Sequence, residues 1–490
     1  MSDPIILAID QGTTSTRAMS FGRNGVPRHL LRREFAQHYP RAGWVEHDPE
    51  DIWRDTLATL TGTAEADGGR VATIGITNQR ETLVVWDRSA GEPVYNAIVW
   101  QDRRGAELCA QLKTDGCEPL IRARTGLLLD PYFSATKLKW ILDEIPGVRA
   151  RAERGELAAG TIDSFLLWRL TGGKVHATDA SNASRTMLFD IHRGCWDEDL
   201  LRLFTVPASL LPEVRDNAAD YGETSLLGSS VLIGGMAGDQ QAAAIGQACF
   251  ARGDVKSTYG TGCFLLLNTG EEAVTSEHGL LTTIAYRLGG RTTYALEGSI
   301  FVAGAAIKWL RDGLGIITQA ADTHDLATRL DDNHGVYMVP AFVGLGAPHW
   351  DPAARATITG LTFDATGAHL ARAALESVAY QTADLIAAMS ADGARDLRQV
   401  RVDGGMAAND WFCQFLADML DTEVARPSNI ETTAAGAAFL AGMTAGMWSG
   451  TDDIAGTWRA DRTFNPKLTA DKRAALNVGW QDAVRRTLSR

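Results

Sequence analysis

The 490-residue sequence lacks the features that mark several common protein classes. Its six cysteines form no Cys-x-x-Cys pair, which argues against zinc ligation and a disulfide scaffold and favours reduced thiols in a cytoplasmic protein. No run of about 18 apolar residues occurs. The N-terminus has no basic segment followed by an apolar stretch. We therefore expect a cytoplasmic protein with no signal peptide and no membrane insertion.

The chain also has fewer basic than acidic residues, and it lacks the common nucleotide-binding motifs. The chain has 47 Lys and Arg against 60 Asp and Glu, a net charge of −13, so we expect no nucleic-acid partner. No Gly-x-x-x-x-Gly-Lys-Ser/Thr and no protein-kinase motif set is present. Gly260-Thr261-Gly262 precedes a predicted strand rather than a helix, which excludes a dinucleotide fingerprint. A few local cations with Mg²⁺ could still bind a nucleotide.

The bulk composition is that of a globular protein, with 45% hydrophobic and 22% charged residues. A chain of 490 residues is too long for one ordinary core, so two or three domains are predicted.

The most informative segment lies at the N-terminus. Residues 5–9 predict a buried strand, and Asp10 stands at its end. Gly12 permits a tight turn, and four hydroxyl side chains and a cation follow: Thr13, Thr14, Ser15, Thr16 and Arg17. Such a turn can bind phosphate while the carboxylate holds Mg²⁺ directly or through water. The alternative is a polar hairpin turn without a ligand.

Two further strands end in polar residues. Residues 71–77 run into Arg80 and Glu81, which can bind neighbouring hydroxyls or form a simple ion pair. Residues 231–235 run towards Asp239 and Gln240. A carboxylate there can accept a proton from a hydroxyl, or it can cap the following helix.

The second half of the chain repeats the opening layout. Residues 255–259, the Gly260–Gly262 turn and residues 263–268 predict another strand–turn–strand unit, so we place a domain boundary near residue 248. Small residues at 297–299 and 303–306 are predicted to open a helix. Residues 400–402 lead into Asp403-Gly404-Gly405, a junction where backbone can lie against a flat ring and a helix N-terminus can face phosphate.

These motifs resemble those of the FGGY carbohydrate kinases of the actin–hexokinase–Hsp70 superfamily, and most closely the branch that phosphorylates glycerol. The resemblance rests on residues 10–17, 78–82, 238–241 and 403–405 and covers nearly the whole chain. It implies an α/β fold of two actin-like ATPase (ribonuclease H-like) domains, with mixed sheets flanked by helices around a central cleft. Residues 1–248 would carry the first phosphate hairpin and the polyol pocket. Residues 249–490 would carry the second hairpin and the adenosine site.

The resemblance also implies a reaction and a set of roles. The reaction would be in-line phosphoryl transfer from ATP to glycerol, giving sn-glycerol 3-phosphate, with Asp239 as general base and Asp10 positioning Mg²⁺. The implied polyol pocket comprises Arg80, Glu81, Trp100, Tyr132, Asp239, Gln240 and Phe264. The implied nucleotide contacts are Thr13, Thr14, Ser15, Arg17, Thr261, Gly304, Gly405 and Asn409.

The sequence departs from the pattern of its relatives at two places, and two alternative functions are kept beside this interpretation. Position 308 is Lys where enterobacterial relatives have Gln near the adenine, so it receives no role. The loop 223–230 is shorter than in those relatives and lacks their Gly-Gly-x-Arg, so we expect no inhibition by fructose 1,6-bisphosphate. By resemblance we expect a homodimer or homotetramer. The alternatives are an FGGY kinase for another polyol or ketose, and a non-catalytic actin-like ATP-binding module.

Overall fold

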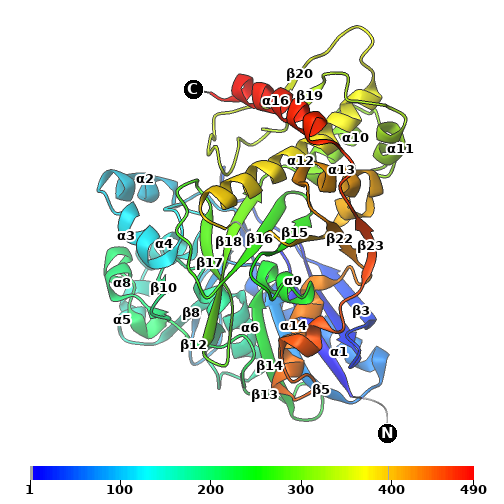
Figure 1. Ribbon diagram of the computed structural model, residues 1–490. Coiled ribbons are helices and arrows are strands. Elements are labelled where there is room, and N and C mark those ends of the chain that lie inside the picture. The colour runs from blue at the N-terminus through cyan, green and yellow to red at the C-terminus, as the bar shows by residue number, and fades with distance from the viewer. Residues whose placement is uncertain (1–3, 395–396, 490) are drawn as a thin grey trace.

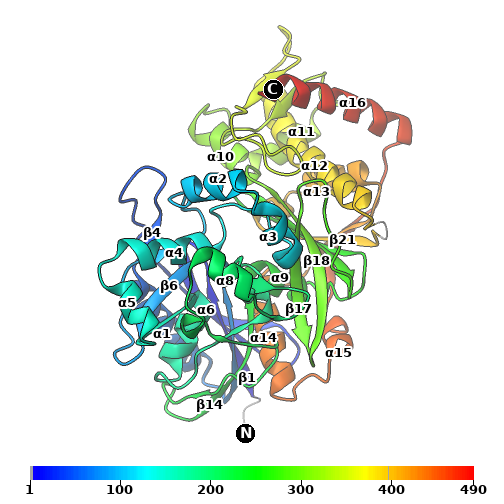
Figure 2. The ribbon, with the colours of Figure 1, turned by 90° about the vertical axis from the view of Figure 1, so that its left-hand side faces the viewer.

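Two mixed β-sheets organise a computed structural model of the protein, which describes residues 4–394 and 397–489 (Figures 1 and 2). The first sheet has the order β13-β14-β5-β1-β2-β3 and lies in the N-terminal half. Its central strand β1 is buried along its whole length, as its apolar residues predict. The strand bounds are β1 (Ile5–Gln11), β2 (Ser15–Phe21), β3 (Pro27–Glu34), β5 (Val71–Asn78), β13 (Glu223–Thr224) and β14 (Val231–Gly238).

The second sheet belongs to the C-terminal half and has the order β17-β18-β16-β15-β21-β22-β23. In each sheet an antiparallel hairpin is joined on its first strand by a parallel strand: β5 beside β1, and β21 beside β15. The repeated strand–turn–strand layout expected from the sequence is therefore confirmed. The bounds are β15 (Asp254–Tyr259), β16 (Cys263–Gly270), β17 (Leu281–Leu288), β18 (Arg291–Ile300), β21 (Gln399–Asp403), β22 (Val424–Pro427) and β23 (Ala460–Phe464).

A smaller four-stranded sheet, of order β4-β7-β6-β8, enlarges the N-terminal half. The remaining strands pair two by two. Bounds in the small sheet are β4 (Glu46–His47), β6 (Leu83–Asp87), β7 (Ala97–Ile98) and β8 (Leu157–Thr161). The paired short strands are β9 (Ala177–Asp179), β10 (Phe189–Asp190), β11 (Cys195–Trp196), β12 (Glu213–Arg215), β19 (Tyr337–Val339) and β20 (Thr357–Thr359).

Helices flank the sheets, and their ends follow the local chemistry. The Asp48 carboxylate caps α1 by accepting from the Glu50 amide at 2.8 Å, and Pro49 opens the first turn. The helices of the N-terminal half are α1 (Pro49–Asp67), α2 (Ala106–Thr114), α3 (Glu118–Thr125), α4 (Ser134–Glu144), α5 (Val148–Glu153), α6 (Ile162–Leu170), α7 (Ala180–Ala183), α8 (Glu198–Phe204), the 3₁₀ turn η1 (Ala208–Leu210) and α9 (Asp239–Gly246).

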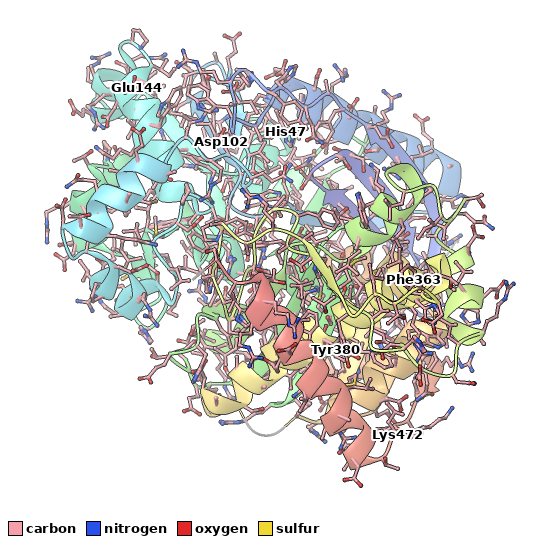
Figure 3. All side chains as sticks on the ribbon, turned by 90° about the horizontal axis from the view of Figure 1, so that it is seen from above. His47, Asp102, Glu144, Phe363, Tyr380 and Lys472 are labelled. Atoms are coloured by element: carbon pink, nitrogen blue, oxygen red, sulfur yellow. The ribbon has the colours of Figure 1, made fainter. Side chains whose placement is uncertain are left out.

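The C-terminal half is built around the long helix α12. Tyr380 on α12 stacks on Trp480 of α16 with ring centroids 5.2 Å apart, and Figure 3 shows Tyr380 close to that terminal helix. The bounds are α10 (Gly304–Asp312), α11 (Asp322–Thr328), α12 (Gly367–Ala391), the 3₁₀ turn η2 (Gly405–Ala408), α13 (Asp410–Leu420), α14 (Thr432–Thr444), α15 (Thr451–Ala455) and α16 (Ala470–Thr487). None of the helices in the part of the chain that the structure describes has both the length and the apolar character needed to cross a membrane.

One predicted helix start is wrong. Residues 297–299 lie inside strand β18, which pairs with β16 and β17, and α10 begins only at Gly304. The strand contains Thr292, Thr293 and Tyr294, residue types that fit a pleated surface, and sheet pairing on both sides outweighs the small residues that follow.

Helix α14 connects the two halves. It follows β22 of the second sheet, yet it packs against α9 and against β14, β5 and β1 of the first sheet (Figure 1). Apolar residues of α14, including Phe439 and Leu440, share one buried cluster with Ile6, Ala8 and Phe21. The first sheet is therefore covered on one face by a helix from the far end of the chain.

Candidate active site

The first hairpin turn places a carboxylate beside a cation. The Gly12 amide donates to the Ser15 carbonyl at 2.9 Å and closes the turn that carries Thr13 and Thr14. Asp10 is buried at the end of β1, where Arg17 donates to it and also to Glu431 at 2.8 Å. Asp10 is the main cause that raises the pKa of Arg17, although burial opposes it. Arg17 is thus held by two carboxylates rather than standing free at the turn.

An aromatic wall stands next to this hairpin. Trp100, Tyr132 and Phe264 come from three distant segments and meet edge to face, with ring centroids 5.5 Å apart for Trp100–Tyr132 and 6.4 Å for Trp100–Phe264. The Trp100 indole N–H donates to the Thr13 hydroxyl at 3.0 Å, which connects the aromatic wall to the first hairpin turn. The structure therefore brings together the three aromatic residues that the sequence proposed for one pocket.

A buried lysine holds the backbone of the loop that carries Tyr132. The Lys137 ammonium donates to the carbonyls of Pro131 and Tyr132, each at 2.6 Å, and of Phe133 at 3.1 Å. Burial lowers the pKa of Lys137 to about 8. Three carbonyl acceptors compensate this buried cation and fix the loop that presents the aromatic ring.

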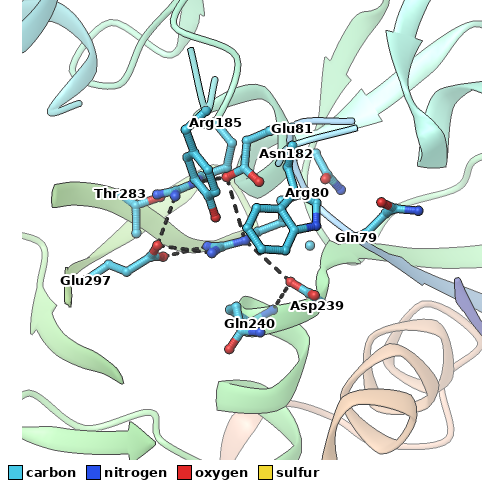
Figure 4. Close-up of polar contacts among 12 residues, drawn as sticks. Gln79, Arg80, Glu81, Asn182, Arg185, Asp239, Gln240, Thr283 and Glu297 are labelled. Carbon is cyan, nitrogen blue, oxygen red and sulfur yellow. Dashed lines mark hydrogen bonds and ion pairs between the residues drawn. The ribbon is translucent and has the colours of Figure 1, made fainter. Parts of the chain in front are cut away.

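Four charged side chains form a buried cluster (Figure 4), and its two guanidinium groups lie next to rings of the aromatic wall. Arg80, Glu81, Arg185 and Glu297 are each at most 3% exposed. Arg80 binds Glu297 with both terminal nitrogens, at 2.5 and 3.0 Å, and Arg185 binds Glu81 at 2.7 Å and Glu297 at 2.9 Å. Glu81 has a φ of 61°, a left-handed conformation that is rare outside glycine and is retained where surrounding contacts enforce it.

Asp239 opens α9 at the edge of this cluster. Its Oδ1 accepts from the Gln240 amide at 2.7 Å and lies 3.4 Å from the Arg80 Nε, while its side chain stays 30% exposed. Gly238 allows Arg80 to pass, because a Cβ there would come within 2.7 Å of the arginine Cγ. Burial raises the pKa of Asp239 to about 6 against the opposing charge of Arg80. An accessible carboxylate with such a pKa suits a general base near neutral pH.

A second buried lysine joins the two halves at this point. Lys256 on β15 donates to the Gln240 side-chain oxygen and lies 3.5 Å from the Phe264 carbonyl. Burial lowers the pKa of Lys256, and the carboxylates Asp403 and Asp239 oppose that shift. Gln240 and Phe264, both expected in the pocket, are therefore fixed by the same cation.

A cavity of about 860 Å³ lies between the second hairpin and helices α10 and α11, and its lining includes Thr261, Gly304, Gly405, Asn409 and Lys308. The side chain of Asn409 is already engaged. It caps α13 by accepting from the Phe412 amide at 3.1 Å and donates to the Thr323 hydroxyl at 3.2 Å. Asn409 therefore holds α11 against α13 at the cavity wall.

Sequence reasoning missed four of these charged residues: Lys137, Arg185, Lys256 and Glu297. Each occurs among apolar or small residues, and a charge in such a segment signals a buried, paired group. That signal could have selected them as candidates, but it could not have named their partners.

The comparisons with known proteins place this geometry in a family. Residues 5–246 match the N-terminal domain of the FGGY family of carbohydrate kinases, and residues 255–445 match its C-terminal domain. The chain belongs to the FGGY family of carbohydrate kinases. It is similar to a glycerol kinase of Gluconobacter oxydans, with 64% identity over 99% of this chain and 95% of that one. A glycerol kinase of Rhodospirillum centenum is 62% identical over 99% and 98% of the two chains.

Solved structures agree with this FGGY fold. The glycerol kinase of Plasmodium falciparum, determined with ADP, superposes with a TM-score of 0.95 at 37% identity over 100% of this chain and 99% of that one. A gluconate kinase of Lactobacillus acidophilus superposes with a TM-score of 0.89 at 21% identity over 98% and 97%, which shows the shared fold alone. The expected two-domain kinase fold, with mixed sheets flanked by helices, is confirmed.

Residues 223–230 of this FGGY kinase comprise the short strand β13 and its connection to β14. This segment contains no Lys or Arg, and the Ser230 hydroxyl donates to the Glu223 carboxylate across it. A bisphosphate would need cations there. The absence of inhibition by fructose 1,6-bisphosphate stays a prediction.

Proposed function

We propose that this FGGY kinase transfers the γ-phosphoryl group of ATP to glycerol, giving sn-glycerol 3-phosphate and ADP. The observation that carries the proposal is Asp239, a partly exposed carboxylate with a raised pKa that lies beside Arg80 at the edge of the buried charge cluster. Relatives named glycerol kinase, 62–64% identical over nearly the full chain, support the choice of substrate.

The pocket suits a small polyol. Trp100, Tyr132 and Phe264 limit its size, while Arg80 and Gln240 supply polar groups next to the base. A site built to hydrogen-bond hydroxyl groups discriminates strongly against analogues that lack them, because its polar groups are then left unpaired. We assign Glu81 to the same recognition set, and its carboxylate is oriented by Arg185.

The transfer step needs positioning more than covalent chemistry. Asp239 takes the proton of the attacking hydroxyl, and the first and second hairpin turns flank the phosphates from opposite halves. The assigned nucleotide contacts are Thr13, Thr14, Ser15 and Arg17 on the first half and Thr261, Gly304, Gly405 and Asn409 on the second.

Asp10 is the side chain that would hold Mg²⁺. The described residues contain no group of three or more His, Cys, Asp or Glu side chains suited to a metal ion. A single carboxylate fits Mg²⁺ in such a site, since this ion is held by one or two carboxylates together with substrate phosphates and water. When bound, the ion neutralises charge on the transferred phosphates. We also propose a cytoplasmic location and a homodimer or homotetramer, on the resemblance and the reduced thiols.

The first experiment measures ADP release with MgATP and each of glycerol, erythritol, xylulose and dihydroxyacetone. We expect glycerol to give the largest kcat/KM. In Asp239→Asn, glycerol binding should persist while kcat falls by roughly 10²-fold or more, because proton transfer to a positioned base is lost. Preference for another polyol would overturn the substrate, and near-normal turnover of Asp239→Asn would overturn the base.

A further inference from the structure

The Arg80 guanidinium lies near three carboxylates, those of Glu297, Asp239 and Glu81, and its geometry shows which one it binds most strongly. Both terminal nitrogens of Arg80 bind Glu297, whereas its Nε faces the Asp239 Oδ1 at 3.4 Å and the Glu81 Oε1 at 3.9 Å. The strong, two-point contact is with Glu297, and the contact with the proposed base is the weaker one.

This division matters because Arg and Asp this close tend to form a two-point ion pair. An Asp239 carboxylate bound in that way would have fewer free lone pairs for a substrate proton, and its affinity for the proton would fall. Something must therefore keep the guanidinium engaged elsewhere. Glu297 is placed to do so.

Glu297 is itself held as an anion. Burial favours its neutral form, but Arg185 and Arg80 outweigh burial and lower the pKa of Glu297 to about 2. Arg185 donates to Glu297 at 2.9 Å and to Glu81 at 2.7 Å, so the four side chains alternate in charge around the cluster (Figure 4). The carboxylate remains ionised throughout the neutral pH range.

The acceptor and its arginine come from different halves of the chain. Arg80 follows β5 of the first sheet, while Glu297 lies on β18 of the second sheet, two residues before Ser299, the register partner of Phe264. The position of Glu297 is therefore fixed by the same sheet that carries one aromatic wall of the pocket.

We propose that Glu297 is a positioning residue of the transfer reaction: it takes up both terminal nitrogens of Arg80 and so keeps the Asp239 carboxylate free to accept the substrate proton. This inference rests on the proposed function, in which Asp239 is the base. The groups that face Asp239 are Arg80 and Glu81 beyond β5, Lys256 on β15 and Asp10 on β1. Glu297 acts on Asp239 through Arg80.

The test compares Glu297→Gln with wild type in kcat, in the KM values for polyol and ATP, and in the pH profile of kcat. Gln keeps the shape but removes the charge, so Arg80 should turn to Asp239. We expect kcat to fall about tenfold or more and the acid limb to move about one pH unit lower, because an uncompensated cation then faces the base. The KM for ATP should stay unchanged.

Glu376→Gln is the matched control. Glu376 is also buried and accepts from an arginine, Arg372, at 2.7 Å, but it lies on α12 away from the cluster. Its variant should keep kcat within about twofold of wild type, with the acid limb in place. An equal loss in both variants without a shift of the acid limb, or a Glu297→Gln enzyme within twofold of wild type, overturns the proposal.

Two further measurements keep the test decisive. If Glu297→Gln does not fold, Glu297→Asp keeps the charge but is too short to reach both nitrogens, so kcat should fall severalfold with the acid limb in place; wild-type kcat would overturn the proposal. Difference infrared titration of the Asp239 carboxylate, against Asp239→Asn, needs no turnover. It should show a lower pKa in Glu297→Gln even if glycerol proves to be the wrong substrate, and an unchanged or higher pKa overturns the inference.

Discussion

At the scale of single residues, the chemistry of Asp239 is set by cations from both halves of the chain. Arg80 lies beside it just beyond β5, and the charge of Lys256 acts on it from β15. Burial raises the pKa of Asp239 to about 6, and both cations act against that rise. Removing either cation, or removing the carboxylate that binds it, should therefore shift the acid limb of the pH profile of kcat in a direction that can be stated beforehand.

Lys256→Met should shift the acid limb upward, opposite to Glu297→Gln. The substitution keeps an unbranched side chain but removes a buried cation whose charge favours the ionised form of Asp239. The pKa of Asp239 should rise by about half a unit to one unit, and kcat at pH 7 should fall accordingly. The measurement is the pH profile of kcat between pH 5 and 9.

Lys472→Met makes the same change on the exposed surface of α16 (Figure 3) and should leave the profile unchanged. An acid limb that stays in place or moves lower in Lys256→Met would contradict the role given to Lys256.

The same residues show how far the sequence could lead. Asp239, Gln240 and the aromatic residues could be named from motifs, because each follows a recognisable strand end or belongs to a family pattern. The partners of Arg80 and Glu81 could not. Glu297 is 217 positions from Arg80, and Arg185 is 104 positions from Glu81. The Arg80–Glu297 pairing depends on how the two halves of the chain meet, and the Glu81–Arg185 pairing depends on how distant segments pack within the N-terminal half; no local pattern encodes either.

At the scale of elements, the contact between α9 and α14 governs the position of the base. Helix α9 carries Asp239 on its first residue, and α14 lies so close that a Cβ on Gly436 would come within 1.8 Å of the Ala242 carbonyl. The reciprocal approach places Gly246 against the Thr432 carbonyl, at 1.9 Å. Their mutual contact could not be predicted from the sequence, because small residues alone do not name the surface they pack on.

Gly436→Ala should push these helices apart. Overpacking of a buried contact costs about 1–3 kcal/mol, and a displaced α9 would move the Asp239 carboxylate off the attacking hydroxyl. We expect a lower midpoint in urea unfolding and a fall in kcat of about tenfold or more, with the KM for ATP less affected.

Gly450→Ala is the control, since its φ of 171° suits any residue and a Cβ there meets no atom within 4 Å. A Gly436→Ala enzyme with wild-type stability and kcat would show that the two helices can separate without consequence.

At the scale of the whole molecule, the chain does not divide cleanly at its midpoint. The repeated hairpin predicts a domain boundary near residue 248, and the two sheets do follow one another along the chain. Yet α14, residues 432–444, returns to cover β14, β5 and β1 of the first sheet (Figure 1). Composition and motif order cannot reveal such a return, because the helix is apolar and would suit either sheet.

The first sheet should therefore not fold without α14. In a fragment of residues 1–248, the face formed by Ile6, Ala8 and Phe21 would lose the cover of Phe439 and its neighbours and be exposed to water. Exposed apolar area costs about 25 cal/mol per Å². Because natural domains have only about 5–15 kcal/mol of stability, the loss of a helix from the core should abolish cooperative unfolding. Circular dichroism during urea titration measures this directly.

A matched fusion protein, in which a flexible linker joins residues 428–449 to the fragment, should regain a sigmoidal transition. A cooperative transition in the fragment alone would show that residues 1–248 are an independent domain and that α14 is only an accessory cover.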